Sequence, residues 1–412
     1  MDVRLDVDYY DEEEKELLRL NYPSEFGRID KVVQAGHIKI PFADFKTYTQ
    51  MHHQNSEDDK LRSFEAIHDS LGDLYGNVNF YTHFDEETSR FYSDRIDNNE
   101  QNHVSESIGC GGALGVISAI YGLTQADWQR INIQGHKDFD FDSAIIQNFK
   151  KKVEVEAKGT ITSDNSEKAN FSYHKSSIKA KKEEKSDSGS DLLIGAITVV
   201  DDVNHAKVYL VDPPDQSNLN DEFRFKIKTL KRLTYYCHWM SIISNRSYLT
   251  IALKNRMKAL ELIDNMNLLN HIVLTNANDK VLKIDENFLK SRCYIGDSKV
   301  GRLSTLGPNK AVFIGLDVEI YNLIAIQDFT SITKFKTESF IKRTRIDLKV
   351  SKQKAERDSF IRNLKFEYRK TRDNLFHFIV EDALVYQNSA GFLYSIINTK
   401  NNYSLPYEFN FH

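Results

Sequence analysis

Two short stretches of the chain carry charged side chains at every second position, alternating with apolar or aromatic residues. They read D-F-D-F-D-S and V-E-V-E-A-K-G-T, and their charged residues are Asp138, Asp140, Asp142, Glu154, Glu156 and Lys158. Side chains on a β-strand alternate between its two faces, so a hairpin of these stretches would bring the carboxylates onto one surface. Crowded carboxylates raise one another's pKa unless a cation lies between them. Oxygen ligands of this kind suit Mg²⁺ or Mn²⁺.

The elements around these stretches are expected to form one mixed α/β domain. We predict a helix from about Ser105 to Gly122, strands near 138–147 and 151–159, and a basic helix near 172–185. Two apolar strands follow, L-L-I-G-A-I-T-V-V and A-K-V-Y-L-V. The order is therefore helix, strand, strand, helix, strand, strand, which indicates a sheet covered by helices.

This pattern resembles the PD-(D/E)xK nuclease superfamily, a fold common among restriction and repair endonucleases. Glu156, Ala157 and Lys158 stand as the E-x-K, and Asp140 is the best match to the preceding aspartate, with Asp142 as its rival. The resemblance covers roughly residues 100–215. The residues G-T after the lysine resemble those that several families of this superfamily carry after their E-x-K. The proline that often precedes the aspartate in the superfamily is absent here.

The resemblance implies roles for single residues. Asp140, Glu156 and the Ala157 carbonyl would hold Mg²⁺ or Mn²⁺, which lowers the pKa of a bound water. Lys158 would position that water and stabilise developing charge. Glu106, near the start of the first helix, would complete or orient the set; it is equally readable as an acid interacting with the helix dipole.

The function implied is a Mg²⁺-dependent endonuclease that hydrolyses DNA in preference to RNA, in a context of defence against foreign DNA. One alternative is an inactive nuclease-fold module that binds nucleic acid or a partner protein. Another is an exposed hairpin with a charged outer face. Two further alternatives concern partners: the chain forms a homodimer, or a partner protein regulates its activity. The glycine-rich run at 109–115 follows no buried strand, so a dinucleotide-binding loop is rejected in favour of helix packing.

The restriction-endonuclease-like core would be flanked by α+β regions on both sides. We expect an N-terminal region of unknown role at 1–95, the nuclease-like domain at 96–215, and a C-terminal region at 223–412 that serves substrate binding, regulation or oligomerisation. The C-terminal region should begin with helix, pass through strands such as A-V-F-I-G-L, and end in helix.

Basic residues are concentrated in two places that could contact phosphates. Between residues 334 and 372 there are 14 Lys or Arg against 5 Asp or Glu; we interpret this stretch either as a groove for nucleic acid or as a charged surface helix. The second place is the basic helix, whose residues could equally form a solvated face. They are His174 and Lys175, Lys179, Lys181, Lys182 and Lys185.

Composition indicates a soluble, cytoplasmic protein without membrane attachment. No fully apolar run approaches the roughly 20 residues of a membrane span, and the acidic N-terminus lacks a signal-peptide pattern. Cys110, Cys237 and Cys293 are far apart, which predicts buried thiols rather than a disulfide framework or zinc site. Trp128 and Trp239 are expected in the core.

Overall fold

The computed structural model divides the chain into two compact units, Met1–Lys228 and Thr229–Leu405. The structure describes residues 1–50, 80–94, 101–130, 140–146, 151–184, 192–211, 221–244, 247–262, 293–307, 309–351 and 375–398, with single residues between some of these segments. The two units are taken in turn.

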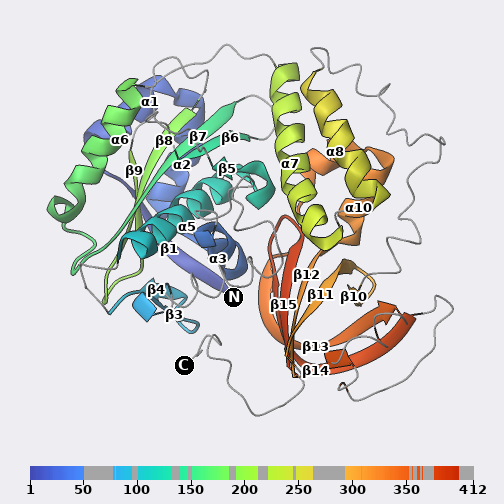
Figure 1. Ribbon diagram of the computed structural model, residues 1–412. Coiled ribbons are helices and arrows are strands. Elements are labelled where there is room, and N and C mark those ends of the chain that lie inside the picture. Colours follow the sequence, from blue (N-terminus) through green and yellow to red (C-terminus); the bar gives the residue numbers. More distant parts are fainter. Residues whose placement is uncertain are drawn as a thin grey trace. The chain divides into compact units, whose positions relative to one another are not determined.

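The first unit is built on a mixed sheet whose strands alternate along the chain with helices (Figure 1). Its strands are β1 (Asp2–Tyr9), β2 (His37–Pro41), β3 (His83–Asp85), β4 (Arg90–Tyr92), β5 (Gln129–Arg130), β6 (Phe141–Ile145), β7 (Lys152–Ile161), β8 (Leu192–Val200) and β9 (Lys207–Val211). Its helices are α1 (Glu12–Asn21), α2 (Pro23–Ala35), α3 (Phe42–Gln50), α5 (Gln101–Tyr121) and α6 (Ser172–Glu184).

The strand order is β3-β4-β1-β9-β8-β7-β6-β5. Strand β2 lies off this path and pairs antiparallel with β1. The pairs β7–β8 and β1–β9 are parallel, while β6–β7 and β8–β9 are antiparallel. The parallel pair β7–β8 is joined through α6, as a parallel connection requires a crossover. Strand β8 is buried along its whole length, which is expected of a central strand with both faces covered.

Helices α5 and α6 cover opposite faces of β7 and β8. On the α5 side, Gly109 lies against Gly159 and Lys158 of β7, and a Cβ on Gly159 would come within 1.9 Å of the Ser105 carbonyl oxygen. On the α6 side, Ile178 fills the space beside Gly195 of β8. Because glycine allows backbone to approach this closely, α5 sits directly on β7.

The second unit contains a closed six-stranded barrel with helices at its flank (Figure 1). The barrel order is β10-β11-β12-β15-β14-β13. The strands are β10 (Cys293–Ile295), β11 (Lys299–Gly307), β12 (Lys310–Asp317), β13 (Phe340–Ser351), β14 (Leu375–Gln387) and β15 (Phe392–Asn398). The helices are α7 (Asp221–Ser244), which begins in the first unit, α8 (Tyr248–Glu261), α10 (Val318–Ile326) and α11 (Phe329–Lys334).

The barrel interior is apolar among the residues that the structure describes. Leu303, Phe313, Leu348 and Phe378 are almost fully buried members of this core. Helix α7 attaches to the C-terminal end of α11 through the buried Arg232, which donates hydrogen bonds to two backbone carbonyls, those of Ile332 and Phe335.

Several sequence expectations are met. The strands near 138–147 and 151–159, the basic helix and the two apolar strands are present as β6, β7, α6, β8 and β9. The glycine-rich run lies inside α5 and packs closely against its neighbours. All three cysteines are buried and free, and both tryptophans are buried.

Other expectations need correction. Residues 1–95 do not form a region of their own, because β1 pairs along four residues with β9 and belongs to the same sheet. Where helix was expected toward the end of the C-terminal region, the last described residues are strand: β14 and β15 lie within 375–398, and 399–412 lie outside the described residues. The basic stretch is strand rather than helix over 340–351, and most of its remainder to 372 lies outside the described residues.

Helix α5 is also long and apolar enough to cross a membrane by length and composition, over His103–Tyr121. In that window 78% is buried inside the protein, so the helix is accounted for as the core helix of the first unit. Among the described residues it is the one helix that passes this test.

Candidate active site

The aspartate of the predicted motif lies where β6 separates from β7. The two strands pair from Ile145 to Phe141, which stands opposite Val155, and the ladder has a bulge between Phe141 and Ala144. Asp140 follows at the open end of this pair. Its carboxylate oxygen Oδ2 accepts a hydrogen bond from the Ala157 amide at 3.1 Å, and its own amide donates to Glu156 Oε2 at 3.2 Å. Asp140 therefore replaces the missing ladder contact with its side chain.

Glu156 is the centre of the site. Its side chain is fully buried, and its Oε1 contacts the ammonium groups of two lysines, Lys158 and Lys181, the latter at 2.6 Å. The same lysines lie 3.9 and 3.8 Å from the two oxygens of Asp140. Two carboxylates and two ammonium groups thus converge within direct contact. The predicted residues Asp140, Glu156 and Lys158 are brought together.

Burial decides the protonation behaviour of this group. Burial first, and the charge of Asp140 second, raise the pKa of Glu156 above its ordinary value, against the opposing charges of Lys158 and Lys181. Burial alone would lower the pKa of Lys158, but the charges of Asp140, Glu156 and Glu106 raise it above its ordinary value. Lys158 is therefore held as a cation, and the charged form of Glu156 depends on the positive groups beside it.

Helix α6 presents one stripe of side chains to this face of β7. His174, Ile178 and Lys181 are four and three residues apart and so lie along one side of the helix. His174 is buried, and its Nε2 has no hydrogen-bond partner. Burial and the nearby charge of Lys158 lower the pKa of His174 to about 4, so the imidazole is neutral at pH 7.

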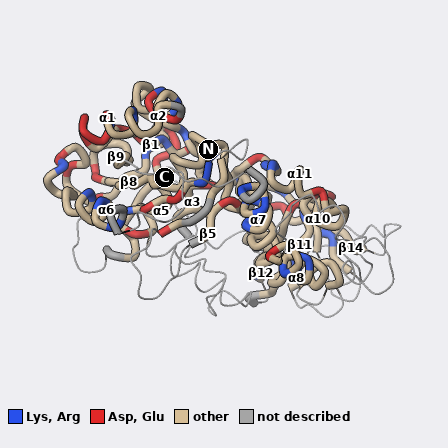
Figure 2. Tube along the Cα trace, turned by 90° about the horizontal axis from the view of Figure 1, so that it is seen from above, with Lys and Arg blue, Asp and Glu red and all other residues tan. Residues whose placement is uncertain are grey.

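The neighbouring stripe of α6 faces α1 instead. Lys175 lies 2.6 Å from Asp11 and 2.9 Å from Glu14, and Lys179 lies 2.8 Å from Glu14. Figure 2 shows the acidic residues of α1 and the basic residues of α6 within one unit. The basic helix is therefore divided: Lys175 and Lys179 anchor it to α1, whereas Lys181 reaches the site.

Glu106 lies on α5, close to the point where that helix crosses β7. The neighbouring Ser105 and Gly109 approach the backbone of Gly159. The Glu106 side chain is exposed, and its charge acts on Lys158 by raising the pKa of that lysine. Glu106 therefore acts on the site through Lys158.

The other charged residues of the two rows are accounted for as follows. Glu154 is 1% exposed, and its side chain pairs with Lys152 at 2.9 Å. Asp138 lies outside the described residues, and so does the side chain of Asp142. The polar face of β7 is not a solvated surface, because Glu154 and Glu156 are both buried.

A second acidic cluster was not anticipated as a site from the sequence. Oxygens of Asp11, Glu13 and Glu14 lie within 4.8 Å of one another, close enough to hold a cation. Lys175 and Lys179 already form ion pairs with these carboxylates, so the cluster is explained as the anchor of α6.

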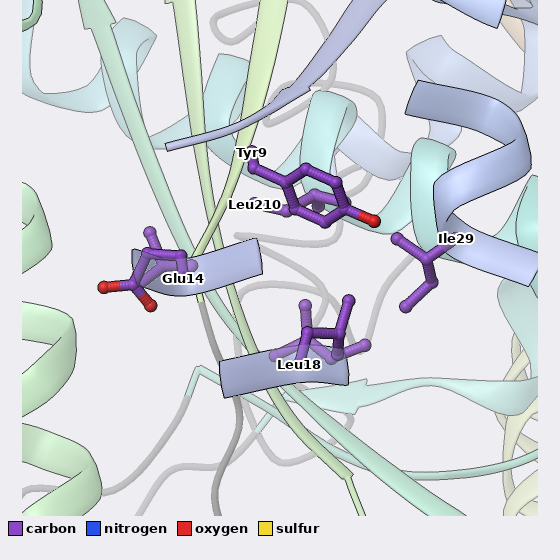
Figure 3. A pocket seen from close by; sticks show the side chains of 7 residues that line it. Tyr9, Glu14, Leu18, Ile29 and Leu210 are labelled. Carbon is purple, nitrogen blue, oxygen red and sulfur yellow. The ribbon is translucent and has the colours of Figure 1, made fainter. Parts of the chain in front are cut away.

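A small, largely apolar pocket lies beside that anchor (Figure 3). It is lined by Tyr9, Glu14, Leu18, Ile29, Ile194, Leu210 and Val211. Glu14 turns its carboxylate toward the lysines of α6, and the Tyr9 hydroxyl donates to Asp30 at 3.2 Å. The polar groups of this pocket are thus engaged in structural contacts.

The donor set around Glu156 fits a hard divalent cation. It offers two converging carboxylates and the neighbouring Ala157 carbonyl, which are oxygen ligands of the type that Mg²⁺ and Mn²⁺ prefer. Burial raises the pKa of Glu156, so its ionised carboxylate must be stabilised by positive charge nearby. Searches against protein-family models, curated proteins and solved structures found no match to this chain.

Proposed function

We propose that the first unit is a metal-dependent endonuclease that hydrolyses phosphodiester bonds of DNA, with its active site at Asp140, Glu156 and Lys158. The observation that carries this proposal is the convergence of these three side chains, from two strands, on one point beside α6. A charged outer face would not require a glutamate to be buried with two lysines in contact with it.

The surrounding elements support the same proposal. Apart from the two-residue strand β5 after α5, the order of helix α5, strands β6 and β7, helix α6 and strand β8 is the one expected of a restriction-endonuclease-like core. In addition, β6 and β7 are antiparallel and β7 and β8 parallel. Gly159 after the lysine has a physical reason, because α5 leaves no room for a side chain there.

Each residue has a distinct task in this proposal. Asp140, Glu156 and the Ala157 carbonyl would hold Mg²⁺ or Mn²⁺, which supplies an activated water and neutralises charge at the phosphate. Lys158, held as a cation by its neighbours, orients the attacking water and stabilises negative charge as it develops on the phosphate oxygens. Glu106 contributes a long-range negative charge that keeps Lys158 protonated.

The test is incubation of the purified chain with supercoiled and linear DNA, and with RNA, in Mg²⁺, Mn²⁺ or EDTA. We expect metal-dependent cutting of DNA that Glu156→Gln and Lys158→Ala each reduce by at least about 100-fold. Glu156→Gln keeps an acceptor for the Asp140 amide, and circular dichroism would establish that the variants are folded. Lys179→Ala, which removes a lysine of the anchor, is the matched control and should cut nearly as well as wild type.

Equal cutting by Glu156→Gln would refute the site. If wild type binds DNA but cuts nothing with either metal, the first unit is instead an inactive nuclease-fold module. Preferential cutting of RNA would correct the substrate while leaving the chemistry in place.

A further inference from the structure

The site contains one more positive charge than the E-x-K pattern supplies. Glu156 Oε1 contacts both Lys158 and Lys181, and Lys181 also lies 3.8 Å from Asp140 Oδ1. Lys158 comes from β7 itself, whereas Lys181 comes from the last turn of α6. With Asp140 and Glu156 ionised, the two lysines bring the local charge to zero.

Lys181 is placed there by the helix as a whole. The same helix is fixed to α1 through Lys175 and Lys179 and to β8 through Ile178 at Gly195. These contacts hold the last turn of α6 beside β7. The Lys181 side chain is 20% exposed, compared with 0% for Glu156, so its ammonium group can move toward solvent while the carboxylate cannot.

We propose that Lys181 is an internal counter-ion that occupies the carboxylates in place of a divalent cation and is displaced when the cation binds. This inference rests on the proposed function. Glu156 Oε2 and Asp140 Oδ2 accept backbone amides, so the oxygens that Lys181 contacts, Glu156 Oε1 and Asp140 Oδ1, are those that would serve a cation. An ammonium group and a divalent cation cannot share them without strong repulsion, because both are positive and the surroundings are largely dry.

The arrangement has a consequence for affinity. Displacing Lys181 requires breaking its contact with Glu156. The free energy needed to break that contact lowers the net affinity of the carboxylates for the cation. Removing the lysine charge should therefore tighten cation binding, by about tenfold for a coupling of ordinary strength. A lysine that merely assisted the reaction would not have this effect.

The experiment measures Mn²⁺ binding to the full chain without DNA, by the electron paramagnetic resonance signal of free Mn²⁺. Lys181→Met removes the charge and keeps the length of the side chain. We expect its Mn²⁺ dissociation constant to be about tenfold lower than that of wild type. Lys181→Arg keeps the charge and should bind as wild type does. Lys179→Met, on the same helix but paired with Glu14, should also bind as wild type does.

Unchanged or weaker Mn²⁺ binding by Lys181→Met would overturn the counter-ion role and leave the proposed nuclease intact, since wild-type cutting is measured separately. Absence of Mn²⁺ binding in wild type and in Lys181→Met alike would overturn both proposals. If Lys181→Met fails to fold, as judged by circular dichroism, Lys181→Gln gives the same readout with a second neutral side chain.

Discussion

Strand β7 of the sheet and strand β13 of the barrel have the same kind of sequence and opposite environments. Both alternate apolar residues with charged ones, V-E-V-E-A-K in β7 and T-R-I-D-L-K-V in β13. In β13 the apolar Ile346 and Leu348 point into the barrel, and Arg345 is exposed. In β7 the apolar Val155 is buried, and so is the charged Glu156.

The difference comes from what covers the second face. In β13 the interior face of the barrel takes the apolar residues, and much of its other face meets water, where its charges form exposed pairs such as Arg343–Asp382 at 3.0 Å. The sheet of the first unit has α5 on one face and α6 on the other, so the charges of β7 are enclosed. Enclosed charges must be paired. In the first unit this pairing brings carboxylates and ammonium groups into contact at one site.

The largest expected effect distinguishes a buried glutamate from an exposed one. Glu156→Ala leaves two lysines around an empty space and should lower the free energy of unfolding by about 3–5 kcal/mol. Glu381→Ala in β14 removes a weak partner of Arg345, 3.8 Å away and 71% exposed, and should cost at most about 1 kcal/mol. Urea unfolding followed by circular dichroism measures both, and similar losses would contradict the contrast.

The next effect tests how closely β7 is covered. In Gly159→Ala the new Cβ would come within 1.9 Å of the Ser105 carbonyl oxygen, so α5 must shift. We expect a loss of about 1–3 kcal/mol or more in the free energy of unfolding, as for other overpacked sites.

Gly27→Ala in α2 is the matched control within the same unit. A Cβ at Gly27 meets nothing within 4 Å, and alanine favours helix over glycine by about 1 kcal/mol. Thermal unfolding should therefore show a lower midpoint for Gly159→Ala and a slightly higher one for Gly27→Ala. A raised midpoint for Gly159→Ala would mean that α5 does not lie on β7.

A third effect uses one histidine in each unit, His174, which is buried, and His238, which is half-buried. Burial lowers the pKa of His238 from 6.5 to about 4, so its contribution to stability is present above pH 6.5. It is lost as the pH falls from 6.5 to about 4, because only the unfolded state then takes up the proton, at about 1.4 kcal/mol per pH unit. The difference in unfolding free energy between wild type and His238→Gln should shrink over that range, and a constant difference would be inconsistent with a neutral His238.

His174 has a pKa lowered to about 4 as well, but the charge of Lys158 contributes to it. Lys158→Met should therefore raise the pKa of His174, by about one unit or less, and leave that of His238 unchanged. Titration of the imidazole resonances by nuclear magnetic resonance measures both. A shift at His238, or none at His174, would place Lys158 elsewhere than beside His174.

The smallest effect is expected on the barrel surface. A double-mutant cycle of Arg343→Ala and Asp382→Ala should give an interaction of at most about 1 kcal/mol. The side chains are 45% and 44% exposed, and water weakens their attraction. Raising the ionic strength should reduce the value further. A coupling of several kcal/mol would show that the outer face of β13 is not solvated.

Local sequence determined much of the first unit. Period-two alternation indicated β6 and β7, and continuous apolar runs indicated β8 and β9. These elements can be predicted from the sequence because their patterns depend only on residues close together along the chain. The grouping of Asp140, Glu156 and Lys158 was also anticipated, through the resemblance.

The secondary structure of the basic stretch in the second unit could not be predicted in the same way. Residues 340–351 carry so many Lys and Arg that helix and strand are both acceptable locally, and pairing with β14 over the whole strand decides for strand. Likewise β1 reads as an isolated N-terminal piece, and only its pairing with β9 shows that it completes the sheet.

The sequence by itself determined which side chains alternate and therefore which charges share a face. Tertiary structure alone decided which of those faces meets water. It buried Glu154 and Glu156, left Arg345 exposed, and selected Lys181 from a row of lysines that look equivalent along α6. The physical reason is that burial depends on what packs over a strand or helix from elsewhere in the chain, and that information is carried by no single stretch of sequence.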